Sequence, residues 1–135
     1  MKGLFLRAGV FVLLSLWMLV GCATQGGYTT PGGLAHLIAS RTEAYILMDV
    51  RTQPEYASGH IPTAINVPLP TVGQNLPSEE KGALIIVYCQ SGGRSRAAKA
   101  VLEKLGFTRV MDFGSILNWK GELVTGMAPT ERTGS

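Results

Sequence analysis

The 135-residue sequence has few side chains of the kinds that bind metals. It contains two cysteines and two histidines, and none of them are paired at the spacing of a zinc site. It also lacks the phosphate-binding loop that ends in Gly-Lys and the Gly-x-Gly-x-x-Gly dinucleotide fingerprint. The sequence therefore predicts no metal site and no cofactor.

Charged residues are also sparse, at 16% of the chain, and the formal net charge is +3. Two of the basic residues, Lys2 and Arg7, lie in an N-terminal segment that we expect to be removed, which would leave a net charge of +1. No stripe of arginines with interleaved aromatic residues is present. The basic pI of about 9.1 therefore does not indicate a nucleic-acid partner.

The N-terminal segment has the pattern of an export signal. Lys2 and Arg7 form a positively charged region before residues 8–20, which are an apolar run of 13 residues. Such a run is too short to span a bilayer comfortably and fits the core of a signal peptide. The next residues, Leu-Val-Gly-Cys at 19–22, resemble the lipobox of bacterial lipoproteins. That resemblance implies an acylated Cys22 as mature N-terminus, hence a membrane anchor in the bacterial cell envelope that faces the periplasm. A buried N-terminal helix, or a signal cut elsewhere, is the alternative.

The chain length predicts one folded domain. We expect residues 1–21 to be the signal peptide and the Gly-rich residues 22–30 to be a flexible tether. Residues 31–125 form the predicted domain. Residues 126–135, with Pro, Thr, Gly and Ser, are predicted to be a frayed tail.

The centre of the domain is a thiol between two apolar segments. Residues 83–88 are apolar without alternation, as in a strand buried on both faces of a parallel sheet. Apolar residues at helical spacing follow in residues 96–105. We therefore predict a three-layer α/β fold with helices on both faces of a mostly parallel sheet of about five strands. Cys89 would end a central strand, at the edge where open α/β sheets place their sites.

The loop after Cys89 favours an ionised sulfur. Gly92 and Gly93 let backbone N–H groups converge on one centre, and the following helix directs its positive end at the loop. Arg94 adds a fixed positive charge. A buried cysteine followed by an ordinary Gly-rich turn is the alternative.

The pattern Cys89-x-Ser91-Gly92-x-Arg94-Ser95 resembles the active-site loop of rhodanese-like sulfurtransferases, and the resemblance covers residues 31–125. It extends to Asp-Val-Arg at 49–51, to Glu-Tyr at 55–56 and to Gly-His-Ile-Pro at 59–62. It implies that Cys89 is the nucleophile and that Arg94 closes the loop. The residues that it implies for substrate binding are Gln90, Ser91, Gly92, Gly93, Arg94 and Ser95.

The resemblance also implies the reaction. Cys89 would take sulfane sulfur from a donor such as thiosulfate, a polysulfide or a persulfide, and pass it to cyanide or a thiol. A lipoprotein that only binds sulfur, senses oxidants or binds a partner is the alternative. A phosphatase on the same fold would need Cys-x5-Arg, whereas the sequence has Cys89-x4-Arg94.

Four residues are expected to support the site. Asp49 should accept hydrogen bonds that fix the neighbouring loop. The resemblance implies an ion pair between Arg51 and Glu55. It also implies that His60 belongs to a local hydrogen-bond network, although a role as general base for Cys89 is the alternative.

The sequence departs from the family pattern at two positions. Gln90 stands where many members have Arg, which removes one positive charge beside the sulfur, so we expect a weaker preference for dianionic thiosulfate. Ser115 stands where a second Gly is common, and we expect that change to be tolerated. A disulfide between Cys22 and Cys89 is an alternative to a reactive thiol.

Overall fold

The computed structural model describes residues 27–127. Its sheet is parallel throughout, and the strands lie in the order β2-β1-β3-β4. The strands are β1 (Ile46–Asp49), β2 (Ile65–Asn66), β3 (Leu84–Cys89) and β4 (Arg109–Ser115). The predicted α/β class is confirmed, but the sheet has four strands within residues 27–127 rather than about five.

Capping residues in the sequence explain where the helices begin and end. Thr30 caps α1, because its hydroxyl accepts a hydrogen bond from Gly33 N–H at 3.1 Å. At the end of α3, Gly106 has φ +97° and Phe107 N–H bonds Leu102 O at 3.1 Å. The helical elements are η1 (Gly27–Thr29), α1 (Pro31–Ser40), α2 (Gln53–Ser58), η2 (Leu69–Thr71), α3 (Gly93–Lys104) and η3 (Ile116–Asn118).

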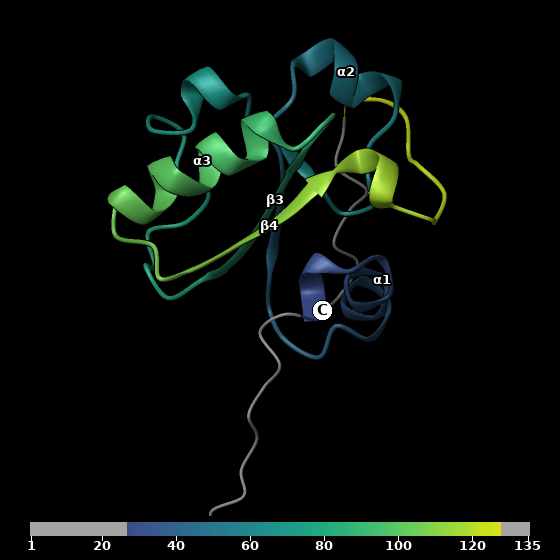
Figure 1. Ribbon diagram of the computed structural model, residues 1–135, viewed down its shortest axis with the longest axis horizontal. Coiled ribbons are helices and arrows are strands. Elements are labelled where there is room, and N and C mark those ends of the chain that lie inside the picture. Colours follow the sequence, from purple (N-terminus) through teal and green to yellow (C-terminus); the bar gives the residue numbers. More distant parts are fainter. Residues whose placement is uncertain (1–26, 128–135) are drawn as a thin grey trace, which may run out of the picture.

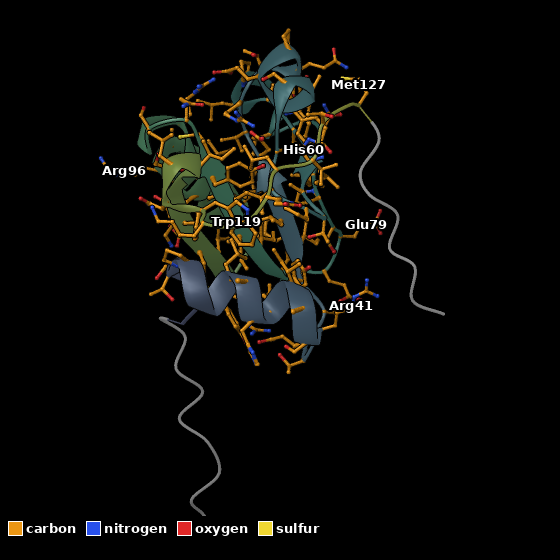
Figure 2. All side chains as sticks on the ribbon, turned by 90° about the vertical axis from the view of Figure 1, so that its right-hand side faces the viewer. Arg41, His60, Glu79, Arg96, Trp119 and Met127 are labelled. Atoms are coloured by element: carbon orange, nitrogen blue, oxygen red, sulfur yellow. The ribbon has the colours of Figure 1, made fainter. Side chains whose placement is uncertain are left out.

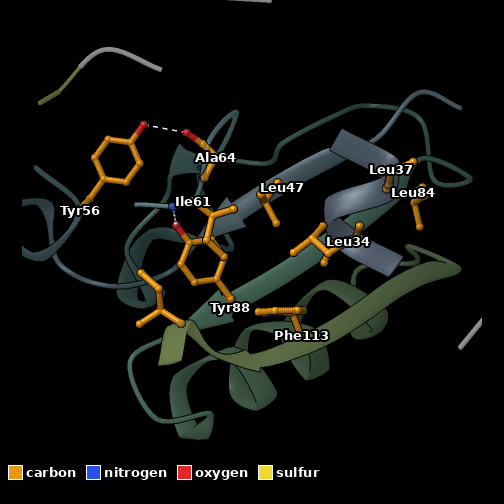
Figure 3. Packing of buried hydrophobic residues seen from close by; sticks show 11 residues of the cluster. Leu34, Leu37, Leu47, Tyr56, Ile61, Ala64, Leu84, Tyr88 and Phe113 are labelled. Carbon is orange, nitrogen blue, oxygen red and sulfur yellow. Dashed lines mark hydrogen bonds between the residues drawn. The ribbon is translucent and has the colours of Figure 1, made fainter. Parts of the chain in front are cut away.

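Strand β3, which lies beside β4 in Figure 1, is buried along its whole length, and its residues alternate between two apolar clusters. Leu84, Ile86 and Tyr88 face a cluster that includes Leu34 and Leu37 of α1 (Figure 3). The residues between them face the other cluster, to which α3 contributes. Cys89 belongs to this second cluster. The thiol therefore lies on the α3 side of the sheet, at the carboxyl end of a central strand.

Two tyrosine hydroxyls satisfy backbone groups within the first cluster (Figure 3). Tyr56 donates to Ala64 O at 2.7 Å, and Tyr88 accepts from Ile61 N–H at 3.0 Å. Both rings are almost completely buried. The second bond connects the segment after α2 to Tyr88, the residue that precedes Cys89. The end of β3 is therefore held by this side-chain contact in addition to its pairing with β1 and β4.

The ends of the domain differ from their prediction. Residues 27–29, predicted as tether, form η1, and Tyr28 donates to Glu43 at 2.8 Å. Gly126, predicted in the tail, donates its N–H to Ala57 O at 2.9 Å. The predicted signal peptide, Cys22 and most of the tail lie outside the described residues. Within residues 27–127, none of the helices has the length and apolar character needed to cross a bilayer.

Candidate active site

Cys89 is the last residue of β3 and is a buried, free thiol. The Gly92 N–H points at its sulfur, with 3.0 Å between N and Sγ. Gly92 is the residue before α3 and has φ +99°, a left-handed conformation that favours glycine. The chain thus reverses direction within three residues and presents its backbone to the sulfur.

These contacts set the acidity of the thiol. Burial by itself raises the pKa of Cys89. Hydrogen bonds from the Ser95 hydroxyl and from the N–H groups of Ser95, Gly92 and Ser91 outweigh burial, so the pKa lies below that of an ordinary thiol. The Ser95 hydroxyl also lies 3.1 Å from Gly92 O, and because its single proton can rotate, it can turn to the sulfur once the thiolate forms.

Arg94 forms a bidentate ion pair with the Glu55 carboxylate. Its two terminal nitrogens bond the two carboxylate oxygens of Glu55 at 2.7 and 2.9 Å. Arg94 holds the pKa of Glu55 down at about 2, and Glu55 raises that of Arg94. The predicted pair of Arg51 with Glu55 is therefore wrong. Glu55 is in the first turn of α2, where it forms a capping box with Thr52, and this fixes its carboxylate toward the loop rather than toward Arg51.

Arg51 instead pairs with Asp49, and both side chains are buried. Arg51 Nε lies 3.0 Å from both carboxylate oxygens, and one terminal nitrogen bonds Asp49 at 2.6 Å and Gly59 O at 2.7 Å. Burial by itself lowers the pKa of Arg51, but Asp49, with smaller contributions from Tyr88 and Glu55, raises this pKa overall. Asp49 also accepts from the backbone N–H of Arg51 at 2.9 Å, which confirms its predicted hydrogen-bonding role.

Gln90 is exposed and sits between two neighbours. Its side-chain oxygen lies 3.4 Å from a terminal nitrogen of Arg51, and its backbone oxygen accepts from the Ser115 hydroxyl at 2.6 Å. Both arginines near the loop are thus paired with carboxylates, and the residue next to the sulfur is neutral. The backbone N–H groups, that of Gly92 among them, are therefore the main source of positive polarity beside the sulfur.

Ser91 and Gly93 are exposed on the outer side of the loop. A Cβ added to Gly93 would meet no other atom within 4 Å. The space beside the start of α3 is therefore open. Within residues 27–127, no group of three or more His, Cys, Asp or Glu side chains could hold a metal ion.

His60, labelled in Figure 2, is fully buried. Its ring stacks on Tyr56 with the centroids 3.7 Å apart, and Nδ1 bonds Tyr56 O at 2.9 Å. Among the described residues, none is a hydrogen-bond partner of Nε2. Neither ring nitrogen bonds Cys89, so the geometry favours the structural role predicted for His60 over that of a general base.

Sequence reasoning missed two residues of the site. Thr52 orients Glu55, donating its backbone N–H to the carboxylate at 2.8 Å; the signal was the Thr-x-x-Glu spacing before a helix. Ser115 was treated as a tolerated change, yet its hydroxyl contacts the loop. No local signal marks this contact, because it depends on how β4 is aligned with β3.

The site consists of a thiol with a lowered pKa beside backbone N–H groups at a strand end. The family model for the rhodanese-like domain matches residues 31–122, more than half of the chain. The chain belongs to the rhodanese-like domain family. In this rhodanese-like domain Cys89 is the last residue of a central strand, the place in the fold that the sequence predicts for it.

Named relatives and a solved structure agree with this assignment. A sulfurtransferase of Allochromatium vinosum is 37% identical over 79 residues, which are 58% of this chain and 74% of that protein. Thiosulfate sulfurtransferase PspE of Escherichia coli is 34% identical over 71 residues, 51% of this chain and 68% of that protein. A structure of a rhodanese with anions from E. coli has a TM-score of 0.59 and 32% identity, and covers 62% of this chain and 100% of its own.

Proposed function

We propose that Cys89 carries the transferred sulfur as a persulfide. The family and the relatives make the protein a rhodanese-type sulfurtransferase; the proposal concerns the route, the donor and the acceptor. The main support for this proposal is the hydrogen-bonded sulfur of Cys89: the Gly92 nitrogen lies 3.0 Å from Sγ, and the thiol pKa is lowered. A thiolate is the form of cysteine that acts as a nucleophile.

The proposed reaction has two displacements. The Cys89 thiolate attacks the outer sulfur of the donor, a new S–S bond forms, and the old bond breaks with its electron pair on the leaving group, which is sulfite for thiosulfate. An acceptor nucleophile, cyanide or a thiolate, then attacks the outer sulfur of the persulfide and releases the Cys89 thiolate. The N–H groups of Ser91, Gly92 and Ser95 stabilise the anion that is present before and after each step.

Steady-state kinetics test this route. If the donor product leaves before the acceptor binds, double-reciprocal plots at several acceptor concentrations are parallel, and Cys89→Ala has no activity. Intersecting lines, or activity retained in Cys89→Ala, would contradict a persulfide on this residue. Inactivity of the wild type with every donor would instead favour the alternative of a sulfur-binding or partner-binding module.

We further propose that the site prefers donors of lower charge than dianionic thiosulfate, such as organic persulfides. Glu55 neutralises Arg94, Asp49 neutralises Arg51, and the residue after the thiol is Gln90. The two arginines Arg51 and Arg94 therefore add little net positive charge to attract a donor. A dianion gains less from such a site than from one with an unpaired arginine.

Gln90→Arg tests the donor preference, with Gln90→Met as a matched variant of similar length and no charge. At a separation of about 7 Å in a water-like dielectric, a new charge attracts a dianion by about 1 kcal/mol, or roughly fivefold in rate. We expect kcat/KM for thiosulfate to rise by about that factor in Gln90→Arg only. An unchanged thiosulfate efficiency would show that charge at this position does not set donor preference.

Export and lipidation are a separate proposal that rests on the sequence. We propose that Cys22 carries an acyl chain and anchors the domain to the bacterial cell envelope, facing the periplasm. Metabolic labelling with a palmitate analogue should mark the wild type and leave Cys22→Ser unlabelled. Equal labelling of both chains, or of neither, would contradict the proposal.

A further inference from the structure

Ser115 lies opposite Cys89 because β4 contains a bulge. Leu84 to Val87 pair with consecutive residues of β4 up to Asp112, but Tyr88 then pairs with Gly114 and Cys89 with Ser115. The irregularity is built from local groups: the Asp112 carboxylate accepts Gly114 N–H at 2.8 Å, and Gly114 has φ +83°. Without the extra residue, a glycine rather than a serine would lie beside the thiol.

The Ser115 hydroxyl joins two backbone segments. It donates to Gln90 O at 2.6 Å and accepts from Leu117 N–H at 3.1 Å, where it caps η3. The first bond is short for hydroxyl to carbonyl oxygen. It connects the end of β4 to the first residue of the Cys89 loop.

The peptide group between Gln90 and Ser91 transmits this contact. A trans peptide is planar, with its C=O and N–H pointing in opposite directions. At one end the Gln90 oxygen is held by Ser115. At the other end is the Ser91 N–H, which together with the Gly92 N–H, 3.0 Å from the sulfur, acts to lower the pKa of the Cys89 thiol. Holding the oxygen therefore fixes the direction of the N–H.

We propose that Ser115 is a positioning residue that holds the Gln90–Ser91 peptide in the orientation that directs the Ser91 N–H at the Cys89 sulfur. The inference rests on the proposed role of Cys89 as sulfur carrier and deepens it. It also changes the expectation for Ser115 from a tolerated substitution to a functional one. The residue touches neither donor nor acceptor and acts through the peptide.

The charged groups around the sulfur do not change when Ser115 is replaced. Arg94 of α3 is the charge that interacts with Cys89, and it is paired with Glu55 of α2. Asp49 of β1 is paired with Arg51. A change in the acidity of Cys89 on substitution of Ser115 therefore reports on the peptide.

The test is a pH titration of the thiolate by its ultraviolet absorbance, using the full chain and subtracting Cys89→Ser, which retains Cys22 and the tyrosines. Ser115→Ala and Ser115→Gly remove the hydroxyl, and Ser115→Thr keeps it. Ser40→Ala is the matched control, because Ser40 also donates to a backbone oxygen, His36 O, at 2.6 Å on the distant helix α1. Thermal unfolding of each variant verifies that it is folded.

We expect the midpoint of the titration to move upward in Ser115→Ala and Ser115→Gly. Below the midpoint the thiolate fraction should fall about two- to tenfold, the equivalent of one net hydrogen bond. Ser115→Thr should restore the wild-type midpoint, and Ser40→Ala should not change it. An unchanged midpoint in both Ala and Gly variants would overturn the inference, as would a shift of equal size in Ser40→Ala.

The titration does not depend on sulfur transfer. A wild type that fails to form a persulfide, together with a shifted midpoint in Ser115→Ala, would contradict the proposed function and support the positioning role. Normal persulfide formation with an unshifted midpoint would support the proposed function and contradict the positioning role of Ser115.

Discussion

Two adjacent glycines in the loop should respond in opposite ways to the same substitution. Gly92 has φ +99° and ψ −15°, a conformation that L-residues rarely adopt. A Cβ there would come no closer than 3.9 Å to Gly114 Cα, so the strain in Gly92→Ala comes from the backbone and not from a clash. A left-handed conformation costs an L-residue about 1–2 kcal/mol. We expect the free energy of unfolding to fall by that amount.

Gly93→Ala is the matched variant. Gly93 is the first residue of α3, its φ is not in the left-handed region, and its Cβ would enter open space. Alanine is favoured over glycine by up to about 1 kcal/mol inside helices, and less at the first position. We therefore expect the free energy of unfolding of Gly93→Ala to be unchanged or slightly higher.

Denaturant unfolding measures the free energy of unfolding of each variant. The rate at which Cys89 takes up sulfur measures the effect of each substitution on the chemistry. If Gly92→Ala relaxes to a negative φ, the N–H that now lies 3.0 Å from the sulfur turns away, and sulfur uptake should slow. Equal stability of the two variants would refute the strain argument. A destabilised Gly92→Ala with wild-type uptake would refute the link between this N–H and the chemistry.

Four further substitutions, at an ion pair, a carboxylate and a buried leucine, probe the support of the site. Arg51→Met leaves the buried Asp49 carboxylate without its partner and should cost about 3–5 kcal/mol in denaturant unfolding, whereas adding Asp49→Asn should recover part of that loss. Glu55 has a folded-state pKa of about 2, below its ordinary value, because it pairs with Arg94. This pairing should stabilise the fold fully when the pH is above the ordinary pKa of Glu55, and progressively less as the pH falls toward 2. The unfolding free energy of Glu55→Gln should lack this acid dependence. Leu102→Ala removes a fully buried side chain of α3 and should cost about 2–5 kcal/mol by the same measurement.

Much of the fold could be predicted because it depends on local patterns. The unbroken apolar run before Cys89 indicates a strand buried on both faces, and β3 is one. Thr30 followed by Pro31 marks the start of α1, and Gly106 marks the end of α3. Each signal lies within a few residues of the feature that it determines.

The pairing of side chains around the site could not be predicted in the same way. Glu55 and Arg94 are 39 residues apart, and their contact depends on how α2 and α3 are placed. The Ser115 contact depends on a one-residue shift in the alignment of β4 with β3. Spacing in the sequence does not determine such tertiary geometry, and the family pattern suggested the wrong partner for Arg51.

Intact mass of the full chain, before and after exposure to thiosulfate or a polysulfide, tests the central claim most directly. We predict that the wild type gains one sulfur atom, that cyanide removes it, and that Cys89→Ser, which retains Cys22, gains none. No gain in the wild type with either donor, or the same gain in Cys89→Ser, would contradict a persulfide carried by Cys89.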